Sequence, residues 1–272
     1  MISTIYERDY FTITEEETAK WEQELENEIV NKNDRSNPIR RSRYRDYPKA
    51  VRHYLSLFPG HLLDAVDLTL EKDTFLSQLA AFEYLLNDQD IGERAILDFI
   101  KSEKAYFIIG SLLKKGYLFG HQALFLFPEF QLGTDYKADY LLVGKNSHGY
   151  HFVFVELEAI NGNITLVDGE FGSVIRKGLN QVEKWESWLE ANFAHLRPIF
   201  EKSMGPKNAS LAREFTIFDK TRIHFAIVAG RRKNFNDLTQ RLQRKKEEER
   251  IKIFHYDNLL EDIALAIGSP TY

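Results

Sequence analysis

The chain has 272 residues, of which 43% are hydrophobic and 13% aromatic, enough to build a hydrophobic core in one large domain or two modest ones. A formal net charge of −5 argues against a protein that coats nucleic acid non-specifically, because phosphate neutralisation needs a concentrated positive surface. The absence of cysteine excludes disulfides, thiolate nucleophiles and cysteine-bound zinc, so any catalysis must use oxygen and nitrogen groups, with carboxylates and a hard metal ion as the expected machinery.

The start of the chain predicts a helix followed by a linker. Residues 1–17 are too charged for a secretory signal, and no stretch approaches the roughly 18 apolar residues that span a bilayer, so we expect a cytoplasmic protein with no membrane partner. In residues 14–30, Thr14 precedes acidic residues as an N-cap precedes the first turn of a helix. Residues 31–48 are polar and interrupted by proline, which indicates a loop.

Helical periodicity gives way to strands near residue 122. Apolar residues recur at intervals of three and four in residues 48–58, 73–87 and 91–100, which predicts helices with one buried face. Three short runs rich in aromatic and β-branched residues then predict strands separated by turns. The strands are residues 123–132, 138–143 and 150–159, and the turns are residues 133–137 and 144–149.

The remainder of the chain alternates helices and strands. The expected helices are residues 169–193, 233–249 and 257–267, the last with Asp257 as N-cap, and the expected strands are residues 222–230 and 251–256. From residue 93 the order is α-βββ-α-β-α-β-α, which predicts an α/β (α+β) domain with a mixed sheet flanked by helices. We place this domain at residues 91–272, after a helical N-terminal region at residues 1–90.

Basic residues gather in three places, so any contact with nucleic acid is expected to be local. The clusters are Arg40, Arg41, Arg43, Arg45, Lys49 and Arg52, then Arg231, Arg232 and Lys233, then Arg241, Arg244, Lys245 and Lys246. We interpret the third cluster as a solvated helix face, because the acidic run EEER follows it directly and offers partners one helical turn away.

Two neighbouring strands carry acidic residues that favour a metal site. Side chains alternate along residues 150–159, so Glu156 and Glu158 share one side of the strand. Adjacent like charges at the end of an apolar strand disfavour each other's ionisation, and a divalent cation is the simplest neutraliser. Hairpin pairing can bring Asp139 of the preceding strand beside Glu156.

Other polar residues near these strands allow more than one interpretation. Asp135 lies in a turn sequence and is assigned to turn chemistry. Glu129 either completes the site or points to solvent from an edge strand. Gln181 falls on the mostly apolar stripe of the helix at residues 169–193, where its amide either positions a metal-bound water or phosphate or caps a backbone group. Arg176 and Lys177 precede it and could bind phosphate.

Residues 124–188 resemble the Shedu family of bacterial anti-phage defence nucleases, whose C-terminal domain belongs to the PD-(D/E)XK group. The family core combines an acidic residue in a D-[YF]-x-L strand, an E-x-[KE] strand and a helix with Q-x-x-x-W. These positions read Asp139, Glu156, Glu158, Gln181 and Trp185 in this sequence. GERAILDFIKSEKAYFIIGSLL and IFHYDNLL extend the resemblance to about residues 90 to 262, and residues 1 to about 90 are not covered.

The resemblance implies a restriction-endonuclease-like core that hydrolyses double-stranded DNA by in-line attack of metal-activated water. Asp139 and Glu156 would be direct ligands of Mg²⁺ (or Mn²⁺), with Glu158 and the backbone carbonyl of Leu157 as further ligands. No histidine pair has convincing zinc spacing, and His148 and His151 are assigned to turn and strand.

This sequence departs from most PD-(D/E)XK nucleases at Glu158, where they place a lysine. A glutamate at this position can bind a second metal or act as a general base, and restriction enzymes of the same fold use the E-x-E form. The number of metal ions is therefore left open.

The candidate residues for contacts with DNA phosphates are Arg176, Lys177, Arg231 and Arg232.

Two functions other than DNA cleavage are compatible with the sequence. A binding module that keeps the nuclease fold without hydrolysis is one alternative, and a scaffold whose function lies in residues 1–90 is another. Because a free nuclease would endanger the host genome, we expect the N-terminal region to restrain or direct the catalytic domain. A homo-oligomer with a phage component as trigger would fit this expectation.

Overall fold

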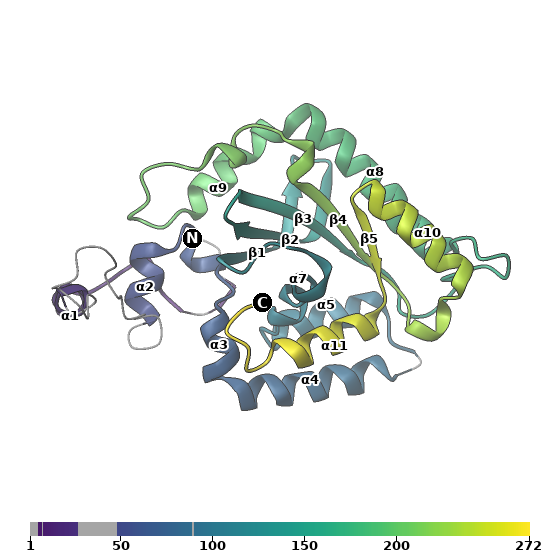
Figure 1. Ribbon diagram of the computed structural model, residues 1–272, viewed down its shortest axis with the longest axis horizontal. Helices are drawn as coiled ribbons and strands as arrows, with labels where there is room; N and C mark the ends of the chain where they lie inside the picture. The colour runs from purple at the N-terminus through teal and green to yellow at the C-terminus, as the bar shows by residue number, and fades with distance from the viewer. Residues whose placement is uncertain (1–4, 7, 27–47, 89) are drawn as a thin grey trace, which may run out of the picture. The chain divides into compact units, whose positions relative to one another are not determined.

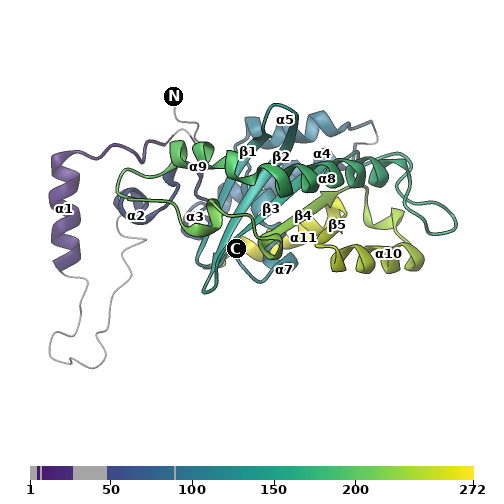
Figure 2. The same cartoon turned by 90° about the horizontal axis from the view of Figure 1, so that it is seen from above.

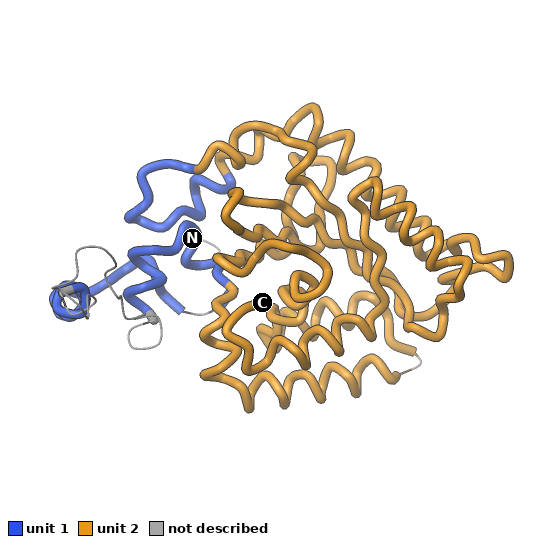
Figure 3. Tube along the Cα trace, in the orientation of Figure 1, with its two compact units in different colours: residues 1–62, 199–211 blue, residues 63–198, 212–272 orange. Residues whose placement is uncertain are grey.

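The structure is a computed structural model that describes residues 5–6, 8–26, 48–88 and 90–272 (Figure 1). The chain forms two compact units, residues 1–62 with 199–211 and residues 63–198 with 212–272 (Figure 3). We call them unit 1 and unit 2. None of the helices in the described ranges is long and apolar enough to cross a membrane.

Unit 1 contains two helices at the start of the chain, α1 (Glu15–Glu26) and α2 (Pro48–Leu55). The expected N-cap is present, because the Thr14 hydroxyl accepts from the amide of Glu17 (3.2 Å) and the Glu17 carboxylate accepts from the amide of Thr14 (2.8 Å). Trp21 of α1 stacks on Tyr54 of α2 with ring centroids 5.3 Å apart. The expected end of the first helix at residues 27–30 and the linker up to residue 47 lie outside the described residues.

A segment from far along the chain completes unit 1. A short 3₁₀ turn, Pro59–His61, follows α2. The second segment of unit 1, residues 199–211, begins within α9 (Arg197–Ser203). Phe200 packs against Phe58 with ring centroids 6.0 Å apart. The amide of Gly205 donates to the carbonyl of Leu57 (2.8 Å), so backbone and side chains both join the two segments.

Unit 2 begins with helices that precede the sheet. They are α3 (Ala65–Leu70), α4 (Lys72–Leu86), α5 (Glu93–Ser102), α6 (Phe107–Gly110) and α7 (Leu112–Gly116). Phe82 of α4 stacks on Phe99 of α5 at 5.6 Å. Unit 2 thus includes α4, whose side chains Phe75, Phe82 and Leu86 are buried.

The sheet of unit 2 is mixed and has the order β1-β2-β3-β4-β5. The strands are β1 (Ala123–Leu132), β2 (Tyr136–Asn146), β3 (Gly149–Leu157), β4 (Ile223–Val228) and β5 (Ile251–Phe254). The first three pair antiparallel, and β4 and β5 add in parallel. Strand β2 is longer than residues 138–143, because Tyr136 and Lys137 still pair with β1.

Helices cover both faces of this sheet. Figure 1 shows α8 (Ser173–Asn192) and α10 (Asp237–Glu248) along one side, and α4, α5 and α11 (Tyr256–Ala266) along the other. The same layering seen from above has α8 lying across the strands (Figure 2). Residues Phe152–Leu157 are all buried whichever face they point to, as expected for a strand covered on both sides. The mixed α/β architecture expected from the sequence is thus present.

The start of α11 differs from the expectation. The N-cap is His255, whose ring nitrogen accepts from the amide of Asn258 (3.2 Å), whereas Asp257 lies inside the first turn. The Asp257 carboxylate instead accepts from the Arg231 guanidinium (2.7 Å) and from the amide of Arg232. An acid in the first turn still favours the helix, because it faces the positive end of the helix dipole.

Candidate metal centre

Asp139 and Glu156 stand side by side at one end of the sheet. Tyr140 of β2 pairs with Val155 of β3, so the next positions along this antiparallel register place Asp139 opposite Glu156. The Asp139 carboxylate also accepts a hydrogen bond from the amide of Leu157 (2.8 Å). Directly opposed residues of an antiparallel pair share a face of the sheet, and the two carboxyl groups therefore face the same side.

Both carboxyl groups are held in a low-polarity environment that favours protonation. Burial raises the pKa of Asp139 to about 6, even though the hydrogen bond from Leu157 favours the ionised form. Burial, followed by the charges of Asp139 and Glu158, raises the pKa of Glu156 to about 9. Only 4% of Glu156 is exposed, and its Oε2 atom is buried without a hydrogen-bond partner among the described residues. A cation at this place would relieve both penalties.

Glu158 is directed toward helix α8. Its amide donates to the carbonyl of Val228 (2.8 Å), which extends the pairing with β4 one residue past the end of β3. Its Oε2 accepts from the Lys177 ammonium (2.8 Å), while its Oε1 lies 3.5 Å from where a Cβ on Gly178 would stand. That Cβ would also come within 2.9 Å of Ile227, so glycine allows α8 to approach this close.

A fourth carboxylate, Glu93, joins the centre from the other layer of helices. Glu93 is the first residue of α5, and its Oε2 accepts from Lys177 at 3.2 Å. Its charge contributes to raising the pKa values of Asp139, Glu156 and Glu158. Glu93 is not among the site residues predicted from the sequence, although it is an acidic residue that follows Gly92 at the start of a predicted helix, within the segment GERAILDFI.

Glu129 does not join the carboxylate group. It is exposed and pairs with Lys137 (2.9 Å) and Lys101 (3.1 Å), and these hydrogen bonds lower its pKa to about 2. Its backbone has φ of 48°, a conformation that L-residues rarely adopt, so the regular strand is interrupted at this position. Of the two interpretations left open by the sequence, the solvent-facing one describes Glu129.

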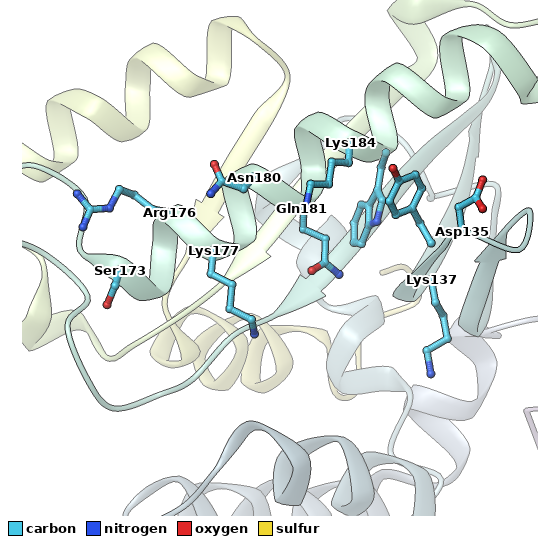
Figure 4. Close-up of a pocket in the computed structure, with 10 residues that line it drawn as sticks. Asp135, Lys137, Ser173, Arg176, Lys177, Asn180, Gln181 and Lys184 are labelled. Atoms are coloured by element: carbon cyan, nitrogen blue, oxygen red, sulfur yellow. The ribbon is translucent and has the colours of Figure 1, made fainter.

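A groove of about 620 Å³ runs along α8, and one of its lining residues, Lys177, pairs with Glu93 and Glu158 of the carboxylate group. Its lining residues are Asp135, Tyr136, Lys137, Ser173, Arg176, Lys177, Asn180, Gln181, Lys184 and Trp185. Four of these are cations and one is an acid. Figure 4 shows Lys177 and Gln181 leaving α8 on the same side, toward which Lys137 also extends. The groove is therefore a place where positive charge is concentrated although the whole chain is acidic.

The residues of the groove differ in how far they are already paired. Arg176 and Lys184 form no ion pair with the described residues, whereas Lys177 holds Glu93 and Glu158. Gln181 is half-buried rather than buried, and its amide makes no hydrogen bond within the described part of the chain. It therefore lines the groove instead of capping a backbone group in the core.

The two arginines after β4 have structural partners. Arg231 donates to Asp257 (2.7 Å) and to the carbonyl of Leu86 (2.8 Å). Arg232 pairs with Glu261 at 2.5 Å. Both guanidinium groups are therefore held in ion pairs with carboxylates of α11.

The donor set suits a hard divalent cation. Every candidate side-chain ligand is a carboxylate, and Mg²⁺ prefers oxygen ligands while keeping several of its waters. Within the described residues, no three His, Asp or Glu side chains converge into a ready-made metal-binding group. The buried, unpartnered Oε2 of Glu156 and Oε1 of Glu158 nevertheless offer lone pairs. Asp139 and Glu156 thus fit a magnesium ion that draws its other ligands from the backbone, water or substrate.

Comparison with known proteins adds an independent finding. A family model described as Shedu protein SduA, C-terminal, matches residues 90–260, which is more than half of the chain. A search of curated proteins found no match. The matched range contains all four carboxylates and the groove along α8.

Proposed function

Because the chain belongs to the Shedu family, we propose that it acts in anti-phage defence as a metal-dependent DNA endonuclease with a PD-(D/E)XK core. The observation that carries the proposal is the pair Asp139 and Glu156, opposed across β2 and β3 with a buried, unpartnered carboxylate oxygen. A buried pair of acids is costly for the fold, and such a cost is typical of functional sites.

In this proposal Asp139 and Glu156 hold Mg²⁺ or Mn²⁺, with the backbone carbonyl of Leu157 as a further ligand. Bound there, the metal ion would lower the pKa of a water and offset the negative charge that builds on the scissile phosphate. The hydrogen bond from the amide of Leu157 fixes the orientation of the Asp139 carboxylate (2.8 Å). The low-polarity surroundings of Glu156 favour its ionised form only when a cation is near.

The groove along α8 is the proposed path of the DNA backbone. Arg176 and Lys184 provide cations that no carboxylate of the described residues already neutralises. Lys137, which is paired with Glu129, lies on the strand side of the groove. Gln181 lies between Lys177 and Lys137 in the groove, where its amide can bond a phosphate oxygen or an attacking water (Figure 4). The groove brings a phosphate chain to the metal centre, and double-stranded DNA is the substrate that we propose.

The decisive experiment is cleavage of linear and circular double-stranded DNA with Mg²⁺ or Mn²⁺. We expect the native chain to cleave and Glu156→Ala to lose cleavage while keeping its circular dichroism spectrum. Asp98→Asn is the matched control, because Asp98 is an exposed acid on α5 that pairs with Arg94. Equal metal-dependent cleavage by native chain and Glu156→Ala would refute the proposed centre.

If neither protein cleaves, titration of the native chain and Glu156→Ala with Mn²⁺ by calorimetry decides the next step. Binding that the substitution abolishes would support a metal centre that awaits a trigger, such as a phage component or assembly into a homo-oligomer. Absence of Glu156-dependent binding would favour a module that binds DNA or protein without hydrolysis.

A further inference from the structure

A second hollow adjoins the groove along α8. It has a volume of about 530 Å³, and its lining combines the turn between β1 and β2 with the later part of α8. Four residues line both spaces, namely Asp135, Tyr136, Asn180 and Lys184. Figure 4 shows Asp135 on the turn, and Asn180 and Lys184 on α8. We call the second space the aromatic recess, and a ligand in the groove can extend into it.

Two aromatic side chains line the recess, Tyr136 at the start of β2 and Trp188 on α8. Both are half-buried, and neither ring stacks on another ring among the described residues. Gly133 in the turn has φ of 64°, and a Cβ there would lie 2.9 Å from the Trp188 ring, so glycine lets the turn lie against the indole. The recess therefore presents aromatic surface that internal ring stacking does not use.

The charge of the recess differs from that of the groove. The recess is lined by one cation, Lys184, and two acids, Asp135 and Glu183, whereas four cations and one acid line the groove. A phosphate is therefore favoured in the groove and disfavoured in the recess. A flat, uncharged group attached to a phosphate chain matches the two spaces together.

The polar side chains of the recess suit the edge of a nucleobase. Asn180 and Lys184 stand one helical turn apart on α8, and neither side chain makes a hydrogen bond within the described part of the chain. Asp135 accepts a hydrogen bond from the neighbouring Thr134 hydroxyl (3.3 Å), which leaves lone pairs for a ligand. An amide both donates and accepts, and a carboxylate accepts from the amino groups of bases.

We propose that the aromatic recess binds an unstacked nucleobase of the nucleic acid whose phosphates follow the groove. Tyr136 and Trp188 stack on the base, while Asn180 and Asp135 bond its edge. The inference rests on the proposed function in taking the groove as the path of the nucleic-acid backbone. It adds a contact to the base, which the cations of the groove do not supply.

The recess gives the groove a preference for DNA with an unpaired base. Removing a base from a paired duplex costs stacking and pairing energy, and a base that is already unpaired avoids this cost. A duplex with a single-nucleotide bulge should therefore bind at least about threefold more tightly than the fully paired duplex. Tyr136→Ala should abolish the difference.

The first test compares two single-stranded oligonucleotides of equal length on the full chain. One carries bases and the other is built of abasic residues, so that both keep every phosphate. Binding is measured by fluorescence anisotropy with Ca²⁺ in place of Mg²⁺. We expect the native chain to bind the oligonucleotide with bases at least about tenfold more tightly, because the abasic chain cannot stack on the aromatic rings.

Variants assign this ratio of affinities to the recess. Tyr136→Ala should lower the ratio below about threefold, and Trp188→Phe should keep it because a ring remains. Arg176→Gln is the matched control, since Arg176 lines the groove but not the recess. It should weaken binding of both oligonucleotides by the same factor and leave the ratio unchanged.

The outcomes separate this inference from the proposed function. Equal affinity of the native chain for both oligonucleotides, with metal-dependent cleavage intact, would overturn the recess alone. A ratio that depends on Tyr136, without cleavage by the native chain, would support the recess and leave the nuclease unsupported. Absence of binding to either oligonucleotide would overturn both the recess and the groove as a path for DNA.

A second measurement needs no DNA chain. Saturation-transfer NMR of the full chain with deoxyadenosine monophosphate reports which ligand protons contact the protein. We expect the base protons to receive at least about twofold more saturation than the sugar protons, because the rings of Tyr136 and Trp188 enclose the base. Equal saturation of base and sugar, or a pattern that folded Tyr136→Ala keeps, would contradict the recess as a base site.

Discussion

The two ends of strands β3 and β4 both contain ionisable side chains with shifted pKa values, yet only one end has buried polar atoms without a hydrogen-bond partner among the described residues. At the carboxyl end of the strands, Glu156 and Glu158 each keep a buried oxygen without a partner among the described residues. At the amino end, His151 and His224 lie with ring nitrogens 3.3 Å apart, and Phe119 stacks on His151 at 4.4 Å. Burial lowers the pKa of His224 to about 3, so the histidine pair is neutral and packed.

The difference between the two ends indicates that a shifted pKa points to a functional site when the ionisable group also lacks hydrogen-bond partners. The two histidines share one hydrogen bond, pack among aromatic rings and are partly exposed, so no ligand is required to explain them. Acids that are buried, mutually repelling and only partly bonded leave a deficit that a cation can remove. The shifted pKa values are common to both ends, and the incomplete pairing is what distinguishes the carboxylate end.

The largest expected effect is a loss of DNA cleavage when a carboxylate is substituted. The same loss after substitution of a histidine at the other end of the strands would contradict the difference between the two ends. Asp139→Asn should lower metal-dependent DNA cleavage on the order of 10³-fold, because a ligand of the metal is lost. His224→Gln should leave cleavage by the folded protein within about threefold. Rates are measured under single-turnover conditions with both proteins checked for folding. A loss as large in His224→Gln would mean that the histidine end also serves the reaction.

Next in size is the contribution of the groove beside the carboxylate end. Arg176→Gln with Lys184→Gln should weaken DNA binding and reduce the slope of log K against log salt by about 2, because each phosphate contact contributes about 0.9. Binding is measured by fluorescence anisotropy at several salt concentrations with Ca²⁺ in place of Mg²⁺. The control, Arg241→Gln with Lys245→Gln on α10, removes the same charge elsewhere and should leave the slope unchanged. Equal slopes for the two double variants would place the DNA outside this groove.

A smaller effect concerns stability at high pH without divalent ions. The pKa of Glu156 is raised from 4.5 to about 9, so its contribution to stability is fully present below pH 4.5 and is lost as the pH rises toward 9. Glu156→Gln should therefore be more stable than the native chain at pH 8 by on the order of 1–3 kcal/mol, and this advantage should vanish below pH 4.5. Urea unfolding in the presence of EDTA measures this difference in the free energy of unfolding. A native chain as stable as Glu156→Gln at pH 8 would contradict the burial cost.

The histidine end should show the opposite and smallest dependence. The pKa of His224 is lowered from 6.5 to about 3, so its contribution is present above pH 6.5 and is lost as the pH falls. His224→Gln should reduce the slope of unfolding free energy against pH between pH 6.5 and 4.5 by up to about 1 kcal/mol per pH unit. Urea unfolding at closely spaced pH values provides the slope. An unchanged slope would show that His224 is not held neutral by the fold.

Elements with a clear period were predictable from the sequence. The alternation in β3 and the apolar stripe of α8 each persist over enough residues to reveal both the element and its buried face. The short helices α3, α6 and α7 were not predicted, because four to six residues are too few to show a helical period. The start of β2 at Tyr136 was also not predicted, because Gly133 and Asp135 are residues typical of turns and Tyr136 follows them directly.

The carboxylate centre was predictable only where local pairing builds it. The short turn between β2 and β3 fixes their pairing register, and this register places Asp139 opposite Glu156. Glu93 lies at the start of α5 and contacts Lys177 of α8. The position of α5 relative to the strands depends on tertiary packing, so a local sequence pattern does not predict this contact. Lys177 was placed among phosphate contacts because a sequence shows its charge but not the acids that it meets.

The composition of unit 1 has a consequence for the order in which the protein matures during synthesis. Residues 199–211 belong to unit 1, so this unit cannot reach its final packing until the ribosome has made more than two thirds of the chain. The first three strands of the sheet, β1 to β3, are complete by residue 157 and therefore emerge earlier. A translation arrest between these points would release a chain with its acidic residues made but its N-terminal unit still unfinished.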